Sequence, residues 1–147
     1  MSSITFFVPG LPKPQGSKKA FMRPGAKHPT MIESAGKPLK DWRDTVEAFA
    51  KRVGVLVPGP VKVYLDFRLP RPKAHFRTGK RSADLREDAP TWHSQRPDID
   101  KLSRAVLDGI TDVVIGDDSC VVKLIAGKRF DSEPGCWIRV EEMKGLK

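Results

Sequence analysis

The sequence predicts an α+β domain with a mixed β-sheet and helices packed on one face of it. Three observations lead to this prediction: strict apolar alternation at residues 61–69, two amphipathic segments with helical spacing, and the order strand, helix, strand, helix, strands. The chain has 147 residues, a usual size for one domain and enough for a core that needs no disulfide. We therefore expect residues 1–147 to form a single domain.

The N-terminal third of the chain predicts one strand, one basic loop and one helix. Residues 3–8, SITFFV, are rich in β-branched and aromatic side chains, and Pro9 ends this strand. The stretch up to Ile32 carries several cations and no acid, and its prolines argue against a helix, so we expect a basic loop. Residues 38–53 have apolar side chains at steps of three and four and predict an amphipathic helix.

The remainder of the chain predicts three strands, a long loop and a second helix. Apolar and polar side chains alternate through 61–69, VKVYLDFRL, which predicts a strand with one buried face. Residues 70–96 show no periodicity and carry seven cations; a loop this long in a compact domain is usually functional or disordered. Residues 100–113 have helical spacing. The last two strands are expected at 120–126 and 136–142, with a polar loop between them.

The composition indicates a basic cytoplasmic protein. There are 27 Lys and Arg against 18 Asp and Glu, a net charge of +9, and nucleic acid is the commonest large anionic partner. No stretch approaches 18 consecutive apolar residues, and the apolar start lacks a basic flank, so neither a membrane span nor secretion is expected. Cys120 and Cys136 match no zinc pattern, and no histidine has ligand spacing; we expect reduced thiols.

An acidic island lies inside this basic chain. Residues 98–118 hold six aspartates and only two cations, Lys101 and Arg104, a local charge of −4, so that the remaining residues carry +13. The segment Arg96-Pro97-Asp98-Ile99-Asp100 enters the second helix. Side chains two apart on extended backbone point the same way, so Asp98 and Asp100 converge only if the helix begins at or after Asp100.

A purely structural explanation exists for each of these acids. Asp98 or Asp100 can be a helix N-cap, Asp100 and Asp108 can flank Arg104 as ion pairs, and the pair in GDDS, residues 116–119, is common in turns. Clustered carboxylates nevertheless repel the phosphates of a bound nucleic acid, so this arrangement costs free energy unless a cation lies between the two. Mg²⁺ binds oxygen ligands, keeps waters, and bridges to phosphate oxygens. The island therefore favours a magnesium site next to nucleic acid.

Residues 96–128, RPDIDKLSRAVLDGITDVVIGDDSCVVKLIAGK, resemble the RusA family of Holliday junction resolvases, which are crossover junction endodeoxyribonucleases. They are similar to the family's pattern D-x-D-N-L-x-K-x-x-x-D-A-L followed by D-D-x-x-V. FFVPGLPKPQ near the start is similar to the family's first strand and proline-rich turn. The resemblance implies an enzyme found in bacteria and their phages that cuts four-way DNA junctions, with Mg²⁺ or Mn²⁺, as a homodimer.

The resemblance assigns roles to individual residues. Asp98, Asp100 and Asp118 fall on the three catalytic aspartates and are the expected metal ligands, with Asp117 beside them. Lys101 stands where asparagine is usual. Arg104 stands where the family has a functional lysine; arginine can stabilise charge on a phosphate but is a poor proton donor, so we expect it to act as a phosphate clamp.

The two basic loops are then expected to hold the DNA phosphates without reading bases. The candidate DNA-binding residues are Lys13, Lys18, Lys19, Arg23, Arg71, Lys73, Arg77, Lys80, Arg81, Arg96 and Lys101. A two-fold symmetric dimer suits a junction with its own approximate two-fold symmetry.

Two other functions remain open on the sequence. One is a non-catalytic DNA-binding or junction-binding protein with a degenerate site, which the departures at Lys101 and Arg104 favour. The other is a metal enzyme with a DxD motif that acts on nucleotide-sugars, for which so basic a surface has no use.

Overall fold

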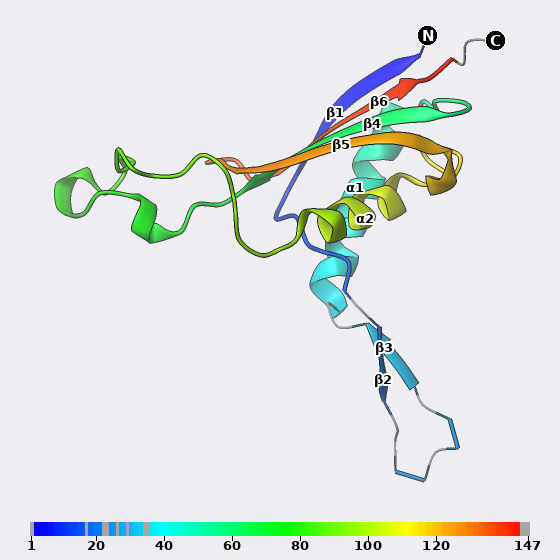
Figure 1. The fold of residues 1–147 in the computed structure, drawn as a ribbon, viewed down its shortest axis with the longest axis horizontal. Coiled ribbons are helices and arrows are strands. Elements are labelled where there is room, and N and C mark those ends of the chain that lie inside the picture. Colours follow the sequence, from blue (N-terminus) through cyan, green and yellow to red (C-terminus); the bar gives the residue numbers. More distant parts are fainter. Residues whose placement is uncertain are drawn as a thin grey trace.

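The computed structural model describes residues 2–16, 18–21, 24–25, 27–28, 30–33 and 36–144. Its centre is a four-stranded sheet in the order β1-β6-β4-β5 (Figure 1). The strands are β1 (Ser3–Pro9), β4 (Val61–Leu69), β5 (Val121–Phe130) and β6 (Gly135–Glu142). β4 pairs in parallel with β5, and the other two pairs are antiparallel. The mixed sheet predicted from the sequence is confirmed.

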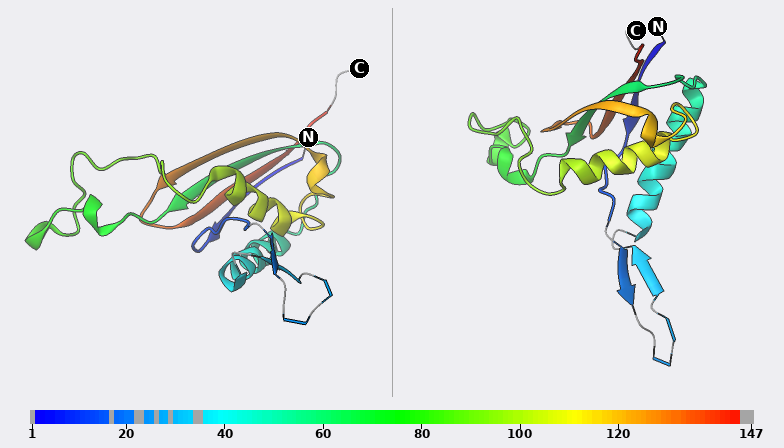
Figure 2. Two further views of the ribbon diagram at one scale, coloured as in Figure 1. Left: turned by 60° about the horizontal axis from the view of Figure 1, so that its bottom comes forward. Right: turned by 45° about the vertical axis from the view of Figure 1, so that its right-hand side comes forward.

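Two helices cover one face of this sheet, as predicted, and they pack against each other (Figure 2). They are α1 (Gly36–Val53) and α2 (Ile99–Ile110). Alternate residues of β4, from Val61 to Leu69, are buried and form one core with Leu39 of α1 and Leu102 of α2. None of the described helices is long and apolar enough to span a bilayer. The second helix is shorter than predicted, because Thr111 is extended and Asp112 has a φ of 65°.

The prediction of a basic loop up to Ile32 was wrong in one respect. Two short strands, β2 (Lys18–Phe21) and β3 (Thr30–Glu33), pair there as an antiparallel hairpin that extends away from the main sheet (Figure 1). Strands of four residues are too short to establish a periodic pattern in a sequence that contains many prolines.

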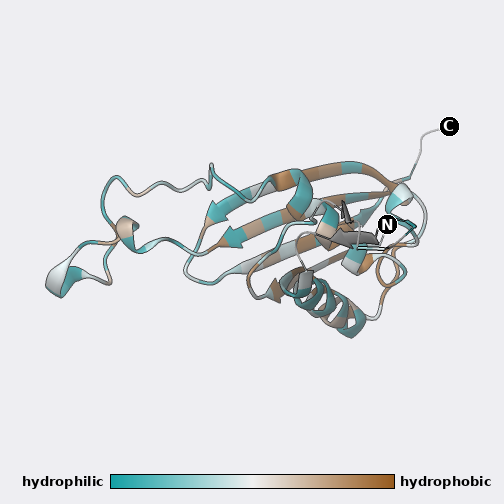
Figure 3. Cartoon of the chain, turned by 90° about the horizontal axis from the view of Figure 1, so that it is seen from below, coloured by the Kyte–Doolittle hydropathy of each residue, from teal (hydrophilic) through white to brown (hydrophobic). Residues whose placement is uncertain are grey.

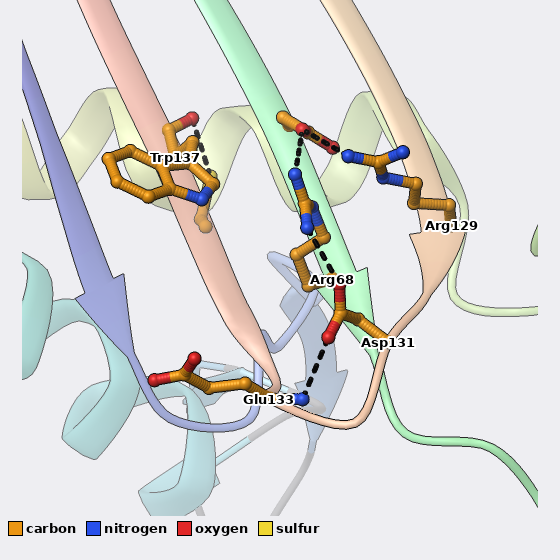
Figure 4. Close-up of polar contacts among 7 residues, drawn as sticks. Arg68, Arg129, Asp131, Glu133 and Trp137 are labelled. Atoms are coloured by element: carbon orange, nitrogen blue, oxygen red, sulfur yellow. Dashed lines mark hydrogen bonds and ion pairs between the residues drawn. The ribbon is translucent and has the colours of Figure 1, made fainter.

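The expected loop at 127–135 was also partly wrong, because β5 continues to Phe130. Residues 127–129 are Gly, Lys and Arg, and they pair in register with residues 66–68 of β4. On the face without helices, Arg68 lies 2.8 Å from Asp66 and 2.6 Å from Asp131, and Arg129 lies 3.5 Å from Asp66 (Figure 4). These contacts, within β4 and between β4 and the end of β5, stabilise a polar strand end that has no apolar alternation.

Asp131 also organises the turn that follows β5. Its carboxylate accepts a hydrogen bond from the Glu133 backbone N–H at 2.9 Å. This bond, followed by the bonds from Arg68, lowers the pKa of Asp131 below its ordinary value. The turn therefore keeps the ends of β5 and β6 in place.

The long segment predicted at residues 70–96 is present between β4 and α2, and it projects from the end of β4 (Figure 1). It contains two single turns of 3-10 helix, η1 (Lys73–His75) and η2 (Gly79–Arg81). The Arg86 side chain donates to the carbonyls of Ala74 and Phe76, both at 3.1 Å, and so holds the segment together. Most of the segment is hydrophilic (Figure 3).

Candidate functional site

The N-terminal end of α2 carries the first two candidate aspartates. Asp98 is the N-cap residue, with extended backbone at φ −72° and ψ 141°, but its carboxylate makes no capping hydrogen bond. Asp100 is exposed in the first turn. The helix begins at Ile99, whereas convergence of the Asp98 and Asp100 side chains on extended backbone required a helix that begins at or after Asp100. Asp98 thus occupies the N-cap position, as the structural explanation expects, but its carboxylate accepts no hydrogen bond from the first turn of the helix.

A cavity of about 580 Å³ lies beside Asp98. Its polar lining combines the cations Lys13, Arg96 and Lys101 with Asp98 and His93. Leucine and proline side chains from 11–14, 69–70 and 97 complete it. Its charged residues are therefore three cations and one carboxylate, set in an otherwise largely apolar wall.

Two backbone attachments place these charges around the cavity. The Gln15 N–H donates to the carbonyl of Lys101 at 2.9 Å, which fixes the N-terminal loop, and Lys13 with it, over α2. On the other side, Lys128 of β5 donates from Nζ to the carbonyl oxygens of Gln95 and Pro97. The residues on either side of Arg96 are thus fixed to the sheet.

His93 is a feature that sequence spacing alone did not single out. The side chain is only 6% exposed, and its Nδ1 atom has no hydrogen-bond partner among the described residues. Burial, and secondly the Lys128 ammonium, lower the pKa of His93 below its ordinary value. Its ring lies 4.8 Å from that of Phe130. The His93 ring is therefore uncharged at pH 7, and it forms part of the cavity wall.

Asp117 and Asp118 lie beyond the other end of α2, at η3 (Asp118–Cys120). The Asp117 carboxylate accepts hydrogen bonds from the Ser119 N–H at 3.1 Å and from the Ser119 hydroxyl. These bonds lower the pKa of Asp117 below its ordinary value. The turn explanation is correct for Asp117, and Asp118 beside it is exposed.

One chain does not bring all the candidate ligands together. α2 has 12 residues, so its two ends are about 18 Å apart. Along β5, the path from Val121, next to Asp118, to Lys128, which contacts Pro97, is about 23 Å. Within the part of the chain that the structure describes, no group of three or more His, Cys, Asp or Glu side chains is placed to hold a metal ion.

Arg104 is exposed on α2, between the two ends. The flanking ion pairs with Asp100 and Asp108 do not form among the described residues. Asp108 instead approaches Arg43 of α1, at 3.9 Å. The guanidinium of Arg104 thus remains accessible to a phosphate, as a clamp requires.

The predicted DNA-binding residues divide into four groups. Lys13, Arg96 and Lys101 line the cavity, and Lys73 and Lys80 are exposed on the projecting segment. Three arginines of that segment have protein partners: Arg71 donates to the Pro90 carbonyl at 2.7 Å, Arg77 lies 3.8 Å from Glu87 and Arg81 3.2 Å from Asp84. Lys18 and Lys19 belong to β2, where only the backbone is described, and Arg23 lies outside the described residues.

Fold and site together define a class of protein: a basic α+β protein in which one exposed aspartate, Asp98, borders a cavity that also holds three cations, an arrangement suited to a phosphate-bearing partner. The chain belongs to the RusA family of endodeoxyribonucleases, because the family model described as endodeoxyribonuclease RusA matches residues 9–141. That range includes all the candidate aspartates. The resemblance found in residues 96–128 is thereby confirmed, and the family acts on Holliday junction DNA.

The chain is also similar to the uncharacterized protein YqaN of Bacillus subtilis (strain 168). The two are 27% identical over 143 residues, which cover 97% of this chain and 99% of YqaN. The similarity therefore extends over almost the whole length of both sequences.

Proposed function

We propose that this protein is a divalent-metal-dependent endodeoxyribonuclease that cuts four-way DNA junctions by phosphodiester hydrolysis, in recombination and repair. The observation that carries the proposal is the Asp98 carboxylate, which makes no capping bond although it occupies the N-cap position and borders a cationic cavity. Membership of the RusA family supports the reaction type.

The cationic residues of the cavity bind the DNA backbone. Three segments contribute a cation each: Lys13, Arg96 and Lys101. The backbone bonds at Lys101 and around Arg96 hold these side chains around the same cavity. Phosphate contacts of this kind supply affinity and orientation without reading sequence. Arg104 stabilises negative charge on the phosphate at the reacting bond.

The aspartates are the metal ligands in this proposal. Their hard carboxylate oxygens fit Mg²⁺, and also Mn²⁺, and Mg²⁺ is usually bound through one or two protein carboxylates together with waters and phosphate oxygens. Asp98 and Asp100 supply ligands at one end of α2, and Asp118 with Asp117 at the other. When bound, the ion lowers the pKa of a bound water and stabilises the leaving oxygen.

The proposal includes a homodimer, because the two ends of α2 are about 18 Å apart in one chain. In a two-fold dimer with antiparallel α2 helices, Asp98 and Asp100 of one subunit approach Asp118 of the partner subunit. Two such sites per dimer suit paired cuts in opposed strands.

A nicking assay on a synthetic four-way junction with Mg²⁺ tests the function. We expect Asp100→Asn to lower the nicking rate by about 100-fold or more. Asp112→Asn is the matched control: Asp112 belongs to the same acidic island but to no proposed ligand set, and asparagine tolerates its positive φ. Equal rates for Asp100→Asn and the wild type would refute the site.

A second candidate function is a junction-binding protein without catalysis. It is favoured by the departures at Lys101 and Arg104 and by the separation of the aspartates within one chain. It predicts that EDTA leaves junction binding unchanged and that no metal concentration produces nicks.

A further inference from the structure

One face of the four-stranded sheet is not covered by the helices. Both helices pack on the face that holds the buried residues of β4, which alternate from Val61 to Leu69. The intervening residues of β4 and their partners on β5 and β6 form the open face, which Figure 4 shows with α2 behind the sheet. A groove of about 370 Å³ lies on this open face, a volume within the usual range of ligand sites.

Two exposed tryptophans border the groove. Trp92 is 65% exposed and Trp137 is 42% exposed, although tryptophan is on average highly buried in folded proteins. The Trp137 ring packs against Phe7 with its centroid 5.1 Å away, and this contact restricts its orientation. Both indole rings therefore offer apolar surface to a ligand in the groove.

The floor between the two tryptophans is open. Gly127 of β5 lies there, and a Cβ added to it would meet no atom within 4 Å. Trp92 pairs with Arg129 at the outer side of β5, so three strand spacings, about 14 Å, separate the backbones of Trp92 and Trp137. This distance is several times the roughly 3.4 Å between stacked bases, so the two rings can contact different bases of one strand.

The open face carries more cations than acids. Its strand residues include Lys62, Arg68, Lys123, Arg129 and Arg139 against Asp66 and Glu141. Asp131, in the turn after β5, adds a third acid and contacts Arg68. Arg129 and Arg139 line the groove itself, 3.5 Å from Asp66 and 2.5 Å from Glu141. The face therefore has a positive net charge, which complements a phosphate backbone.

The ring of Tyr64 in the same groove is already in contact with cations. The Lys62 ammonium lies 5.0 Å from its centroid and the Arg139 guanidinium 5.7 Å. Trp92 and Trp137 are thus the aromatic rings of the groove that remain for stacking with a ligand.

We propose that the open face of the sheet binds single-stranded DNA, with unpaired bases stacked on Trp92 and Trp137 and phosphates held by Arg129 and Arg139. Aromatic side chains beside cations bind single strands in this way, because every base has a flat face and every nucleotide a phosphate. The cores of protein interfaces are depleted of charged residues, so two arginines and an aspartate in the groove argue against a protein partner. DNA follows from membership of a family of endodeoxyribonucleases.

This site is separate from the cavity beside Asp98. The cavity is lined by Leu69, which belongs to the buried alternation of β4, whereas the groove is lined by Tyr64 of the opposite face. The two sites meet only where Trp92, in the groove, is followed by His93, in the cavity wall. Binding at the groove therefore requires neither the proposed metal ligands nor cleavage.

A comparison of two oligonucleotides tests whether bases are recognised. In buffer with EDTA, fluorescence anisotropy measures the affinity for oligo(dT) of about 10 nucleotides and for an abasic oligomer of the same length. We expect oligo(dT) to bind about 10-fold or more tightly, because only its bases can stack on the indole rings. Equal affinities overturn the proposal, since phosphates alone would then account for binding, and they leave a protein as the occupant of the groove.

Substitution of Trp92 separates stacking from general apolar contact. We expect Trp92→Phe to keep most of the affinity for oligo(dT), and Trp92→Leu, which stays apolar but cannot stack, to lose about 10-fold. Leu85→Ala, at a 44% exposed residue of the projecting segment, is the control and should bind like the wild type. Circular dichroism checks that each variant is folded. Wild-type affinity in Trp92→Leu overturns the proposal.

Intrinsic fluorescence gives a second readout that needs no loss of affinity. The chain has three tryptophans, and the third, Trp42, is only 4% exposed. We expect oligo(dT) to quench the wild-type fluorescence by stacking, and to leave unchanged the fluorescence of the double variant Trp92→Phe, Trp137→Phe. Equal quenching of the two proteins overturns the proposal.

The outcome is distinguishable from that of the proposed function. If oligo(dT) binds more tightly than the abasic oligomer and four-way junctions are not nicked with Mg²⁺, the groove stands and the proposed function fails. If junctions are nicked and the two oligomers bind equally, the proposed function stands and the single-strand site is wrong.

Discussion

Lys128 on β5 donates from its Nζ to the carbonyl oxygen of Pro97 at 2.7 Å. A second bond from the same Nζ reaches the carbonyl of Gln95. One lysine in the sheet thus fixes the backbone directly before Asp98. The position of the candidate carboxylate depends on this contact between segments that lie 31 residues apart in the sequence.

Replacing Lys128 should therefore disturb Asp98 without touching a proposed ligand. We expect Lys128→Met to lower the nicking rate by about 10- to 100-fold, as loss of a group that orients a metal ligand does. Loss of the two bonds should reduce the free energy of unfolding by about 1–2 kcal/mol. Lys144→Met, an exposed lysine away from the cavity, serves as the control in urea unfolding and nicking assays; equal behaviour of the two variants would contradict a positioning role.

His93 predicts how stability depends on pH. Burial lowers the pKa of His93 in the folded state, so the unfolded state binds more protons below the ordinary pKa of about 6.5. The free energy of unfolding should then decrease as pH falls from 7.5 to 5.5. We expect His93→Gln to reduce this dependence in urea unfolding, and His28→Gln, at an exposed histidine, to leave it unchanged. An unaltered pH slope in His93→Gln would show that the ring is not buried in the neutral form.

Gly109 lies where α2 packs closely against α1. A Cβ added there would lie 2.8 Å from Cγ1 of Val46 and 3.3 Å from the carbonyl oxygen of Arg43. We expect Gly109→Ala to destabilise the protein by about 1–3 kcal/mol, although alanine is the better helix former. Gly127→Ala, which meets no atom within 4 Å, is the control in thermal unfolding. A stabilised Gly109→Ala protein would mean that the helices are less closely packed.

The cavity cations predict the salt dependence of DNA binding. In metal-free buffer, we expect Lys13→Ala and Lys101→Ala each to weaken junction binding and to reduce the slope of log K against log salt by about 0.9. The backbone bond from Gln15 to Lys101 survives this truncation, so the loop stays in place. Lys144→Ala should keep the wild-type slope. Unchanged slopes in both cavity variants would place the DNA elsewhere.

Strong local periodicity made parts of the fold predictable. The alternation in 61–69 coincides with β4, and the apolar spacing in 38–53 lies inside α1, because burial of one face imposes the period. The hairpin of β2 and β3 and the C-terminal end of β5 were not predicted. Their pairing depends on partner strands, and short or polar strands carry no such period.

The candidate site divides in the same way. Residue types and their order along the chain identified the aspartates, the basic loops and the family, since those depend on chemistry and spacing alone. Only the tertiary structure placed Asp98 beside Lys13 and Lys101 in one cavity, buried His93 there, and put Asp118 at the opposite end of α2. Distances between segments are set by how helices and strands pack. The 12 residues of α2 keep Asp98 and Asp118 apart, although both belong to one short acidic stretch of the sequence.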